Sequence, residues 1–176
     1  MGTYNAKNLQ VLEGPEPIRR RPGMYIGSTT STGLHHLVWE ILDNCVDEAL
    51  NDQCDVIEIT LEKDGGITIK DNGRGIPIDI FKKTKKSAME ILFTTLHSGG
   101  KFSNDNYKVS GGLHGVGMAV VCALSEKLLA TSRRDGFEWI QSYSKGKATS
   151  KLKKGKAVRS YGTSVYFKPD PTIFPK

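Results

Sequence analysis

The chain has 176 residues, of which 38% are hydrophobic and 25% are charged, and this length and composition fit one soluble globular domain with a sizeable core. No apolar run approaches the roughly 20 residues that a membrane span needs, and the N-terminus lacks the apolar stretch of a secretory signal. The three cysteines form no CxxC pair, which predicts free thiols in a reducing cytoplasm, with Cys45 and Cys122 buried among apolar neighbours.

The formal net charge of +6 is concentrated in two lysine clusters. One consists of Lys82, Lys83, Lys85 and Lys86, and the other of Lys145, Lys147, Lys151, Lys153, Lys154 and Lys156. Two solvated loops explain them. Binding of a polyanion such as DNA is the alternative, and such binding would be non-specific and sensitive to salt.

The first half of the chain predicts an arm, a loop, a helix and a hairpin. Residues 1–13 carry few core-forming side chains, and the proline- and arginine-rich segment 14–22 predicts a loop. Apolar residues at helical spacing predict an amphipathic helix over 33–50. Alternation with period two in 56–61 and 67–71, on either side of Asp64-Gly65-Gly66, predicts a β-hairpin.

The second half predicts two helices and three strands. Helices are expected at 87–96 and 118–124, and strands at 128–132, 137–143 and 164–168, with a lysine-rich turn region between the last two strands. Residues 97–117 form a long segment rich in Gly, Ser and Asn, and such a loop in a compact domain is usually functional or disordered. The fold class is therefore α+β, with a mostly antiparallel sheet and helices on one face.

The predicted helix 33–50 places several polar side chains on one face, opposite its apolar stripe, at 100° per residue. They are His36, Glu40, Asp43, Asn44 and Asp47. A solvated face is the ordinary explanation. However, the helix contains no Lys or Arg, so the acids Asp43, Asp47 and Glu48 need compensation by a cation or an arginine.

A magnesium ion would provide that compensation. Asn44 can give its carbonyl oxygen to such an ion, because hard cations prefer oxygen ligands. Glu40, one turn earlier, can polarise a water for attack on phosphorus, a role typically worth about 10²–10⁴-fold in rate. His36 either orients Glu40 or is a structural helix residue.

Asp71 lies on the same strand face as Ile67 and Ile69, which predicts that its carboxylate is at least partly buried. A buried carboxylate needs donors. An adenine amino group is one candidate, and backbone amides of a tight turn are the other. Gly73 and Gly75, which follow, let the backbone turn sharply and approach a ligand.

Four glycines, Gly111, Gly112, Gly115 and Gly117, precede an apolar helical run. Backbone N–H groups at a helix N-terminus bind anions, so this segment could be a phosphate cradle, and an ordinary glycine-rich turn is the alternative. It matches neither the Walker loop nor the Rossmann fingerprint. Gly99 and Gly100 would let the preceding segment close as a lid, on which Lys101 and Tyr107 could reach a phosphate and a base.

In these motifs the chain resembles the GHKL superfamily of ATPases, and most closely the ATPase subunits of bacterial type IIA topoisomerases, of the gyrase B or topoisomerase IV E type. The resemblance covers nearly the whole chain. It rests on Arg20-Arg21-Pro22-Gly23-Met24-Tyr25-Ile26-Gly27, Gly33-Leu34-His35-His36, Asp43-Asn44 with Asp47-Glu48-Ala49, residues 71–77, Leu96-His97-Ser98-Gly99-Gly100-Lys101-Phe102 and residues 107–117.

The resemblance implies the Bergerat fold, an eight-stranded mixed sheet backed by helices that hold ATP and Mg²⁺. By position it implies that Glu40 is the general base supported by His36, that Asn44 is the magnesium ligand, and that Asp71 accepts the adenine amino group together with Thr163.

Further residues are implied to surround the nucleotide. The phosphate cradle would consist of Gly112, Leu113, His114, Gly115, Val116, Gly117 and Met118, and Tyr107 would be the lid tyrosine near adenine. Arg74 would pair with Glu48 and line the pocket floor with Gly75, Ile76 and Pro77. Arg134 would be the rim arginine contacted by aminocoumarin inhibitors.

The resemblance also implies partners. Tyr4, in a dimerisation arm over residues 1–13, would cross to the nucleotide of a second copy, and residues 14–176 would be the ATPase domain. A DNA-cleaving partner of the gyrase A or topoisomerase IV C type, and DNA itself, would join the complete complex. We expect the chain to be a fragment, lacking the last helix and strand of the domain, the transducer domain and the metal-binding domain.

Several rivals stay open. Histidine kinases lack the water-activating glutamate that Glu40 supplies, whereas Hsp90-type and MutL-type proteins keep it but differ from the segment 97–117. A nucleotide-sensing or nucleic-acid-binding module without catalysis is the rival from another class. Residues 3–6 and 19–22 lean toward topoisomerase IV, and gyrase remains the alternative.

Overall fold

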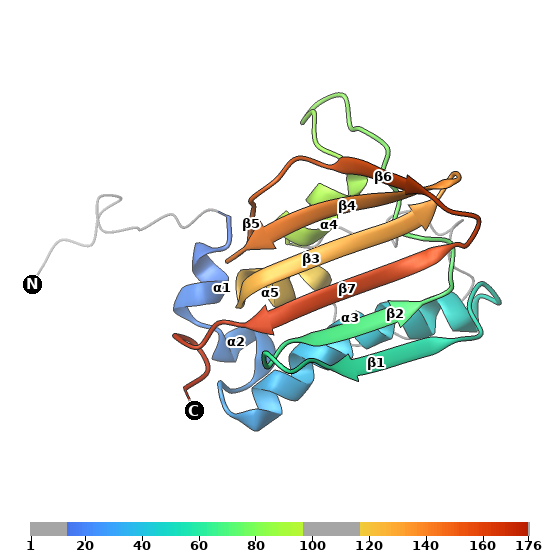
Figure 1. The fold of residues 1–176 in the computed structure, drawn as a ribbon. Coiled ribbons are helices and arrows are strands. Elements are labelled where there is room, and N and C mark those ends of the chain that lie inside the picture. The colour runs from blue at the N-terminus through green and yellow to red at the C-terminus, as the bar shows by residue number, and fades with distance from the viewer. Residues whose placement is uncertain (1–13, 97–116, 176) are drawn as a thin grey trace, which may run out of the picture.

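A computed structural model of the protein describes residues 14–96 and 117–175. One sheet forms the front layer, and the helices α3, α4 and α5 lie behind it on a single face (Figure 1). The helices are α1 (Glu16–Arg20), α2 (Gly23–Ile26), α3 (Ser31–Leu50), α4 (Ala88–Thr94) and α5 (Gly117–Ala123). The strands are β1 (Ile57–Leu61), β2 (Ile67–Asp71), β3 (Ser125–Arg134), β4 (Phe137–Ser144), β5 (Lys147–Ala148), β6 (Lys153–Ala157) and β7 (Gly162–Pro169).

The strand order is β1-β2-β7-β3-β4-β5, with β6 also paired to β4. Every pairing between described strands is antiparallel. The α+β class, the hairpin and the helices on one face are therefore confirmed. The eight-stranded mixed sheet is not what the described residues form, since they contribute seven strands without a parallel pair.

Strand β7 is the organising strand of the sheet. It comes last in the chain, yet it inserts between β2 and β3, so that Asp71 pairs with Thr163 and Ser132 pairs with the same Thr163. Hydrogen bonds on both sides make β7 a central strand, and Val165 and Phe167 on its inner face are buried. Three segments that are far apart in sequence thus meet at one end of the sheet.

The core lies between this inner sheet face and the helices. Helix α5 is buried from Met118 to Ala123, which is the pattern of a helix enclosed on all sides. Leu37 and Ile41 of α3 and Phe93 of α4 are buried in the same core cluster. Helix α4 begins at an N-cap, where the Ser87 hydroxyl accepts from the Glu90 amide at 3.1 Å.

The prediction of a loop over 14–22 was wrong, because this segment contains α1 and leads into α2. Prolines suggested a loop, but they stand at the start of α1, where a missing amide hydrogen costs nothing. Ile18 is buried and provides the hydrophobic anchor of this short helix.

The lysine-rich region 145–156 was predicted as a turn and instead contains β5 and most of β6. All five residues of β6 are exposed, and Lys154 lies over the Phe137 ring at 3.7 Å from its centroid. Lysines on an edge strand discourage pairing with other chains, so much of this charge has a structural explanation.

Arg19 ties α1 to the last described segment of the chain. Its Nη2 lies 2.7 Å from Asp170 Oδ2, and its Nη1 donates to the Ala123 carbonyl at 2.8 Å. Burial alone would raise the pKa of the Asp170 carboxyl, but hydrogen bonds from Thr172 and Arg19 outweigh it and hold this pKa below its ordinary value.

We predict that Arg19→Ala lowers the free energy of unfolding at neutral pH by about 2–3 kcal/mol, somewhat less than the loss of one partner of a fully buried ion pair. Because the folded-state pKa of Asp170 is depressed, the stabilisation is present above the unfolded-state pKa and is lost as the pH falls through the folded value. Urea unfolding at neutral and acidic pH measures this. The exposed Arg159→Ala is the control, and an equal loss in both variants would contradict the assignment.

Candidate functional site

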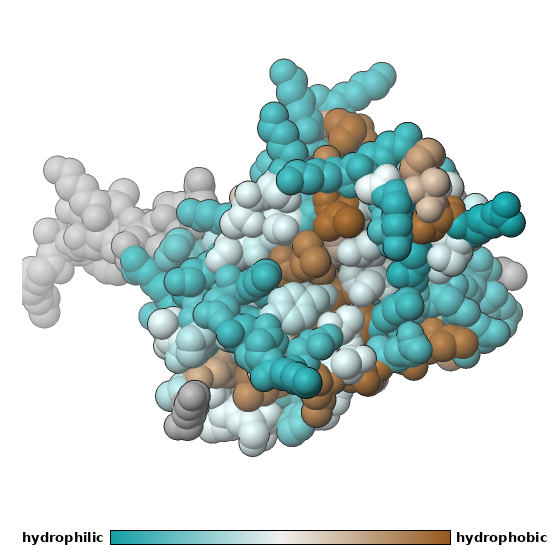
Figure 2. All heavy atoms as spheres, in the orientation of Figure 1, coloured by the Kyte–Doolittle hydropathy of each residue, from teal (hydrophilic) through white to brown (hydrophobic). Residues whose placement is uncertain are grey.

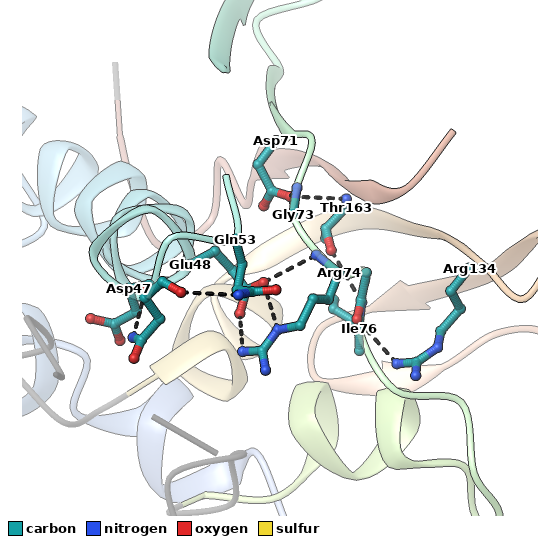
Figure 3. A network of polar contacts seen from close by, with 11 residues as sticks. Asp47, Glu48, Gln53, Asp71, Gly73, Arg74, Ile76, Arg134 and Thr163 are labelled. Carbon is teal, nitrogen blue, oxygen red and sulfur yellow. Dashed lines mark hydrogen bonds and ion pairs between the residues drawn. The ribbon is translucent and has the colours of Figure 1, made fainter. Parts of the chain in front are cut away.

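The carboxylate of Asp71 is held at the junction of β2 and β7. Its Oδ1 accepts from the amide of Gly73 at 2.9 Å and from the amide of Thr163 at 3.2 Å (Figure 3). Asp71 is only 5% exposed, so the predicted burial is confirmed. Of the two explanations for its burial, the backbone amides are confirmed, because they cap one oxygen. The residue also lines a cavity.

The turn after Asp71 is tied to two other strands. The Thr163 hydroxyl accepts from the Ile76 amide at 3.2 Å, and the Ser132 hydroxyl donates to the Ile76 carbonyl at 2.7 Å. Gly75 adopts φ +82°, and a Cβ there would lie 2.8 Å from the Arg133 carbonyl and the Ser132 Oγ. Only glycine fits this conformation and this spacing.

Helix α3 contacts the same turn through Glu48. Arg74 donates from Nη2 to Glu48 Oε1 at 2.7 Å and from Nε to Oε2 at 3.1 Å, and the Arg74 amide also donates to Oε2 at 3.1 Å (Figure 3). This bidentate pair confirms the contact expected from the resemblance. Arg74 therefore supplies the counter-charge for Glu48, which is the arginine compensation that the sequence left open beside a cation.

Glu40 faces inward from α3 toward the start of α5. It is 5% exposed, and its Oε2 accepts from the Gly117 amide at 2.9 Å. The Asn44 side-chain amide donates to the Glu40 carbonyl at 2.8 Å, which turns the other end of that amide, its oxygen, away from the helix backbone. The polar face of α3 is therefore not a solvated face.

Other residues of α3 also differ from the simple helical-wheel expectation. Asp47 is 1% exposed, whereas Val46 from the predicted apolar stripe is 36% exposed. His36 is half-buried, and its ring packs edge-on against Trp39 with 4.9 Å between centroids. Helix α3 has neighbours on both sides, the sheet and α5, so its burial does not follow a single stripe.

A cavity of about 650 Å³ lies between α3, α4, the turn after β2 and the inner face of the sheet. The predicted site residues that line it are Asn44, Glu48, Asp71, Arg74, Gly75, Ile76, Pro77, Met118, Arg134 and Thr163. Drug-sized ligands occupy cavities of about 300–1,000 Å³. The structure thus brings together residues from five separate segments of the chain.

Other predicted site residues lie elsewhere. Glu40 and Gly117 lie beside the cavity, joined by their hydrogen bond, and His36 lies one turn before Glu40 on α3. Tyr4, Lys101, Tyr107, Gly112, Leu113, His114, Gly115 and Val116 lie outside the described residues.

The apolar lining is the part that sequence reasoning missed. It includes Ile41, Cys45, Ile69, Phe81, Ile91, Leu92 and Val165. For Ile69 a signal existed, because it shares a strand face with Asp71. For Phe81 and the α4 residues, no sequence signal indicated a place in the cavity wall, since only the folded chain brings them opposite α3.

The Cys45 thiol lines the cavity beside the Asp71 carboxylate. Burial, reinforced by the charge of Asp71 and a hydrogen bond to it, raises the pKa of the Cys45 thiol far above its ordinary value. Burial likewise raises the pKa of Cys122 to about 12. All three cysteines are free, which confirms the prediction of free thiols.

No group of three or more His, Cys, Asp or Glu side chains within the described ranges is arranged to hold a metal ion. Nor does any helix of the described parts combine the length and apolar character that crossing a membrane requires.

The chain belongs to the family described as histidine kinase-, DNA gyrase B- and HSP90-like ATPases, which matches residues 29–173. The fold and the site thus define an ATPase of the GHKL type. Among proteins similar to this chain, DNA gyrase B of Thermotoga maritima is 55% identical over 99% of the chain and 27% of that protein.

The DNA topoisomerase 4 B protein of Staphylococcus aureus (strain Mu50) is also 55% identical, over 97% of the chain and 26% of its own length. The chain therefore spans about a quarter of the length of these relatives. A crystal structure of the 43K ATPase domain of Thermus thermophilus gyrase B in complex with an aminocoumarin superposes with a TM-score of 0.80 at 44% identity, covering 92% of this chain and 40% of that one.

We predict that Cys54, which is half-buried at the surface, reacts with iodoacetamide at about pH 8, whereas Cys45 and Cys122 do not, because the thiolate is the nucleophile. Mass spectrometry of the alkylated chain measures this. In guanidinium all three cysteines should react, which is the control. Rapid alkylation of Cys45 in the folded chain would mean that Asp71 and the surrounding core do not lie against its thiol as described.

Proposed function

We propose that this chain is the ATP-binding and ATP-hydrolysing domain of a type IIA DNA topoisomerase, coupling Mg²⁺-ATP binding and dimer closure to DNA strand passage. The observation that carries the proposal is the buried Asp71 carboxylate in the floor of an apolar cavity, together with the buried Glu40 carboxylate of α3, which contacts the start of α5. The two carboxylates lie in different settings, as recognition of a base and activation of a water require.

Asp71 is suited to receive the adenine amino group. Both backbone donors go to Oδ1, so neither of them occupies Oδ2, which can accept from a ligand. Thr163 and the turn at Ile76 fix the position of the carboxylate. Ile69, Ile76 and Val165 provide apolar contacts for a flat base.

Glu40 is suited to take a proton from the attacking water. It is buried, and the Gly117 amide orients its carboxylate toward the beginning of α5. The cradle over Gly112–Met118 would present its amides to the phosphates, with Lys101 and Tyr107 closing over the nucleotide and His36 supporting Glu40. A positioned base contributes about 10²–10⁴-fold to such a reaction.

The residues present fit a magnesium ion held chiefly by phosphate oxygens and water. Mg²⁺ is commonly bound through one or two protein groups together with substrate phosphates, and Asn44, whose amide nitrogen is engaged by the Glu40 carbonyl, has its oxygen available for that purpose. When bound, the ion would neutralise charge on the phosphates.

The whole protein's partners belong to the same proposal. Tyr4 and the arm over 1–13 would complete the site of a second copy in an ATP-bound homodimer, and a DNA-cleaving partner and DNA would join in the cytoplasm. Arg134, which donates to the Gly75 carbonyl at 3.2 Å at the cavity edge, would contact aminocoumarins. Relatives named gyrase and topoisomerase 4 match at the same 55%, so the proposal covers both.

We predict that Asp71→Asn weakens binding of a non-hydrolysable ATP analogue with Mg²⁺ by about 10–100-fold, because an amide replaces the acceptor and leaves a buried polar group unsatisfied. Isothermal titration of this chain measures the affinity. Asp52→Asn, at an exposed position whose positive φ asparagine tolerates, is the matched control. Undiminished affinity in Asp71→Asn would exclude the adenine role.

We predict that Glu40→Gln in the complete protein lowers ATP turnover by about 10²–10⁴-fold while ATP binding survives. Glutamine keeps an oxygen that can accept from the Gly117 amide but cannot take the proton. The exposed Glu16→Gln on α1 is the control. Lost binding would make Glu40 structural, and unchanged turnover would exclude Glu40 as the base. ATP binding without turnover in the unsubstituted protein would favour the alternative of a nucleotide-sensing module without catalysis.

A further inference from the structure

A second, smaller crevice of about 230 Å³ lies on the opposite face of the sheet, behind Asp71. Its lining includes Val56, Glu58, Lys70, Asn72, Arg133 and Tyr161. Side chains alternate between the two faces of a strand, so Lys70 and Arg133 point away from the cavity that Asp71 and Arg134 line. Figure 1 shows the ends of β2 and β3 and the start of β7 side by side at this edge. Figure 2 shows that hydrophilic side chains surround a centre of apolar and neutral ones on the open face.

Arg133 is the central residue of this crevice. It is 9% exposed, and its Nη2 donates to the Asp71 carbonyl at 3.0 Å. The guanidinium reaches across β7 at Gly162, where a Cβ would come within 2.4 Å of Nη2 and 2.1 Å of the Asp71 carbonyl oxygen. Gly162 therefore leaves the space through which Arg133 contacts Asp71.

The charge of Arg133 is not balanced within the described parts of the chain. No ion pair between described residues includes Arg133, whereas Lys70 and Glu58 pair with each other at 3.7 Å. Two cationic residues, Lys70 and Arg133, and two acidic residues, Glu58 and Asp71, line the crevice. Glu58 pairs with Lys70, and backbone amides cap the Asp71 carboxylate, so neither acid forms an ion pair with the guanidinium. A buried cation without a counter-charge is costly, and a guanidinium has five N–H donors, of which one donates to the Asp71 carbonyl.

We propose that this crevice binds a small oxyanion, a carboxylate or a phosphate group, on the guanidinium of Arg133, and that the bound anion is coupled to the nucleotide cavity through the Asp71 carbonyl. The planar guanidinium can receive such a group through two parallel N–H bonds while Nη2 keeps its bond to Asp71. The hydroxyl of Tyr161 and the ammonium of Lys70 border the same space.

The coupling follows from the two roles of Asp71. Its carboxylate faces the nucleotide cavity, and its carbonyl accepts from Arg133 on the other side of the sheet. An anion that holds the guanidinium in place also holds Asp71 in the position that receives the base. By thermodynamic reciprocity, the anion raises the affinity for the nucleotide by the same factor by which the nucleotide raises the affinity for the anion. We expect a factor of about five, which is the lower end of typical allosteric couplings. This part of the inference rests on the proposed function.

The anion site is tested by titrating the isotope-labelled chain with inorganic phosphate and, separately, with acetate, and following the Nε–Hε signal of Arg133 by NMR. A saturable shift of this signal is the expected result. Tighter binding of phosphate would identify phosphates as the source, and tighter binding of acetate would identify carboxylates. A signal that does not saturate, or shifts confined to cavity residues such as Asn44, would overturn the site.

Three variants sharpen the test. Lys70→Gln should weaken the anion by several-fold while leaving Arg133 and Asp71 in place, and Arg133→Lys should abolish the two-bond contact while keeping the charge. Lys127→Gln, on β3 but outside the crevice, is the matched control and should bind as the unchanged chain does. Equal anion affinity in all three variants would overturn the proposal. Lys70→Gln compared with the control Lys127→Gln is a sufficient test, so the result stands even if Arg133→Lys does not fold normally.

The coupling is tested by titrating the ATP analogue with and without saturating anion. With the anion present, the affinity for the ATP analogue should rise by about fivefold in the unchanged chain and should not rise in Arg133→Lys. This variant also serves as the control for direct competition, because an anion that competes for the nucleotide cavity would still do so in it. An equal effect in both would exclude the coupling. If the chain bound no nucleotide at all, the proposed function would fail, while the NMR titration would still decide the anion site.

Discussion

The structure of the site depends on a single constraint, the burial of a carboxylate where β2 meets β7. Removing the Asp71 carboxylate from water is unfavourable unless donors replace the water. Two backbone amides do so at one oxygen, and one of them belongs to Thr163, 92 positions later in the sequence. The turn to Pro77, the central position of β7 and the small residues at the junction all keep these donors in place.

The second constraint is the way in which α3 is held between two neighbours. Glu48 binds the turn after β2, and Glu40 binds the start of α5. One rigid helix therefore sets the separation between the floor of the cavity and the segment that leads into α5. Because both contacts use carboxylates of the same helix, a shift of α3 would disturb both ends of the site together.

Several sequence-based errors have a common physical origin. The segment 14–22 has proline where a helix can accept it, and the lysine-rich region 145–156 has charges where an edge strand can carry them. Local composition described these segments correctly as polar and exposed in part. It could not show that Ile18 has a core to enter or that β4 has a free edge to pair with.

The α+β class, helix α3, the hairpin of β1 and β2, and the family could all be predicted from the amino-acid sequence, because hydrophobic periodicity and glycine-bearing motifs are local properties. Asp71, Glu40 and the pairing of Arg74 with Glu48 could also be identified, since these residues lie within recognisable motifs. Three features needed the folded chain: which oxygen of Asp71 is capped, the presence of Cys45 and Phe81 in the cavity wall, and the contact of Arg133 with Asp71 from the reverse face. These contacts join strands and helices that are distant in sequence, and no local pattern encodes the insertion of β7 between β2 and β3 that creates them.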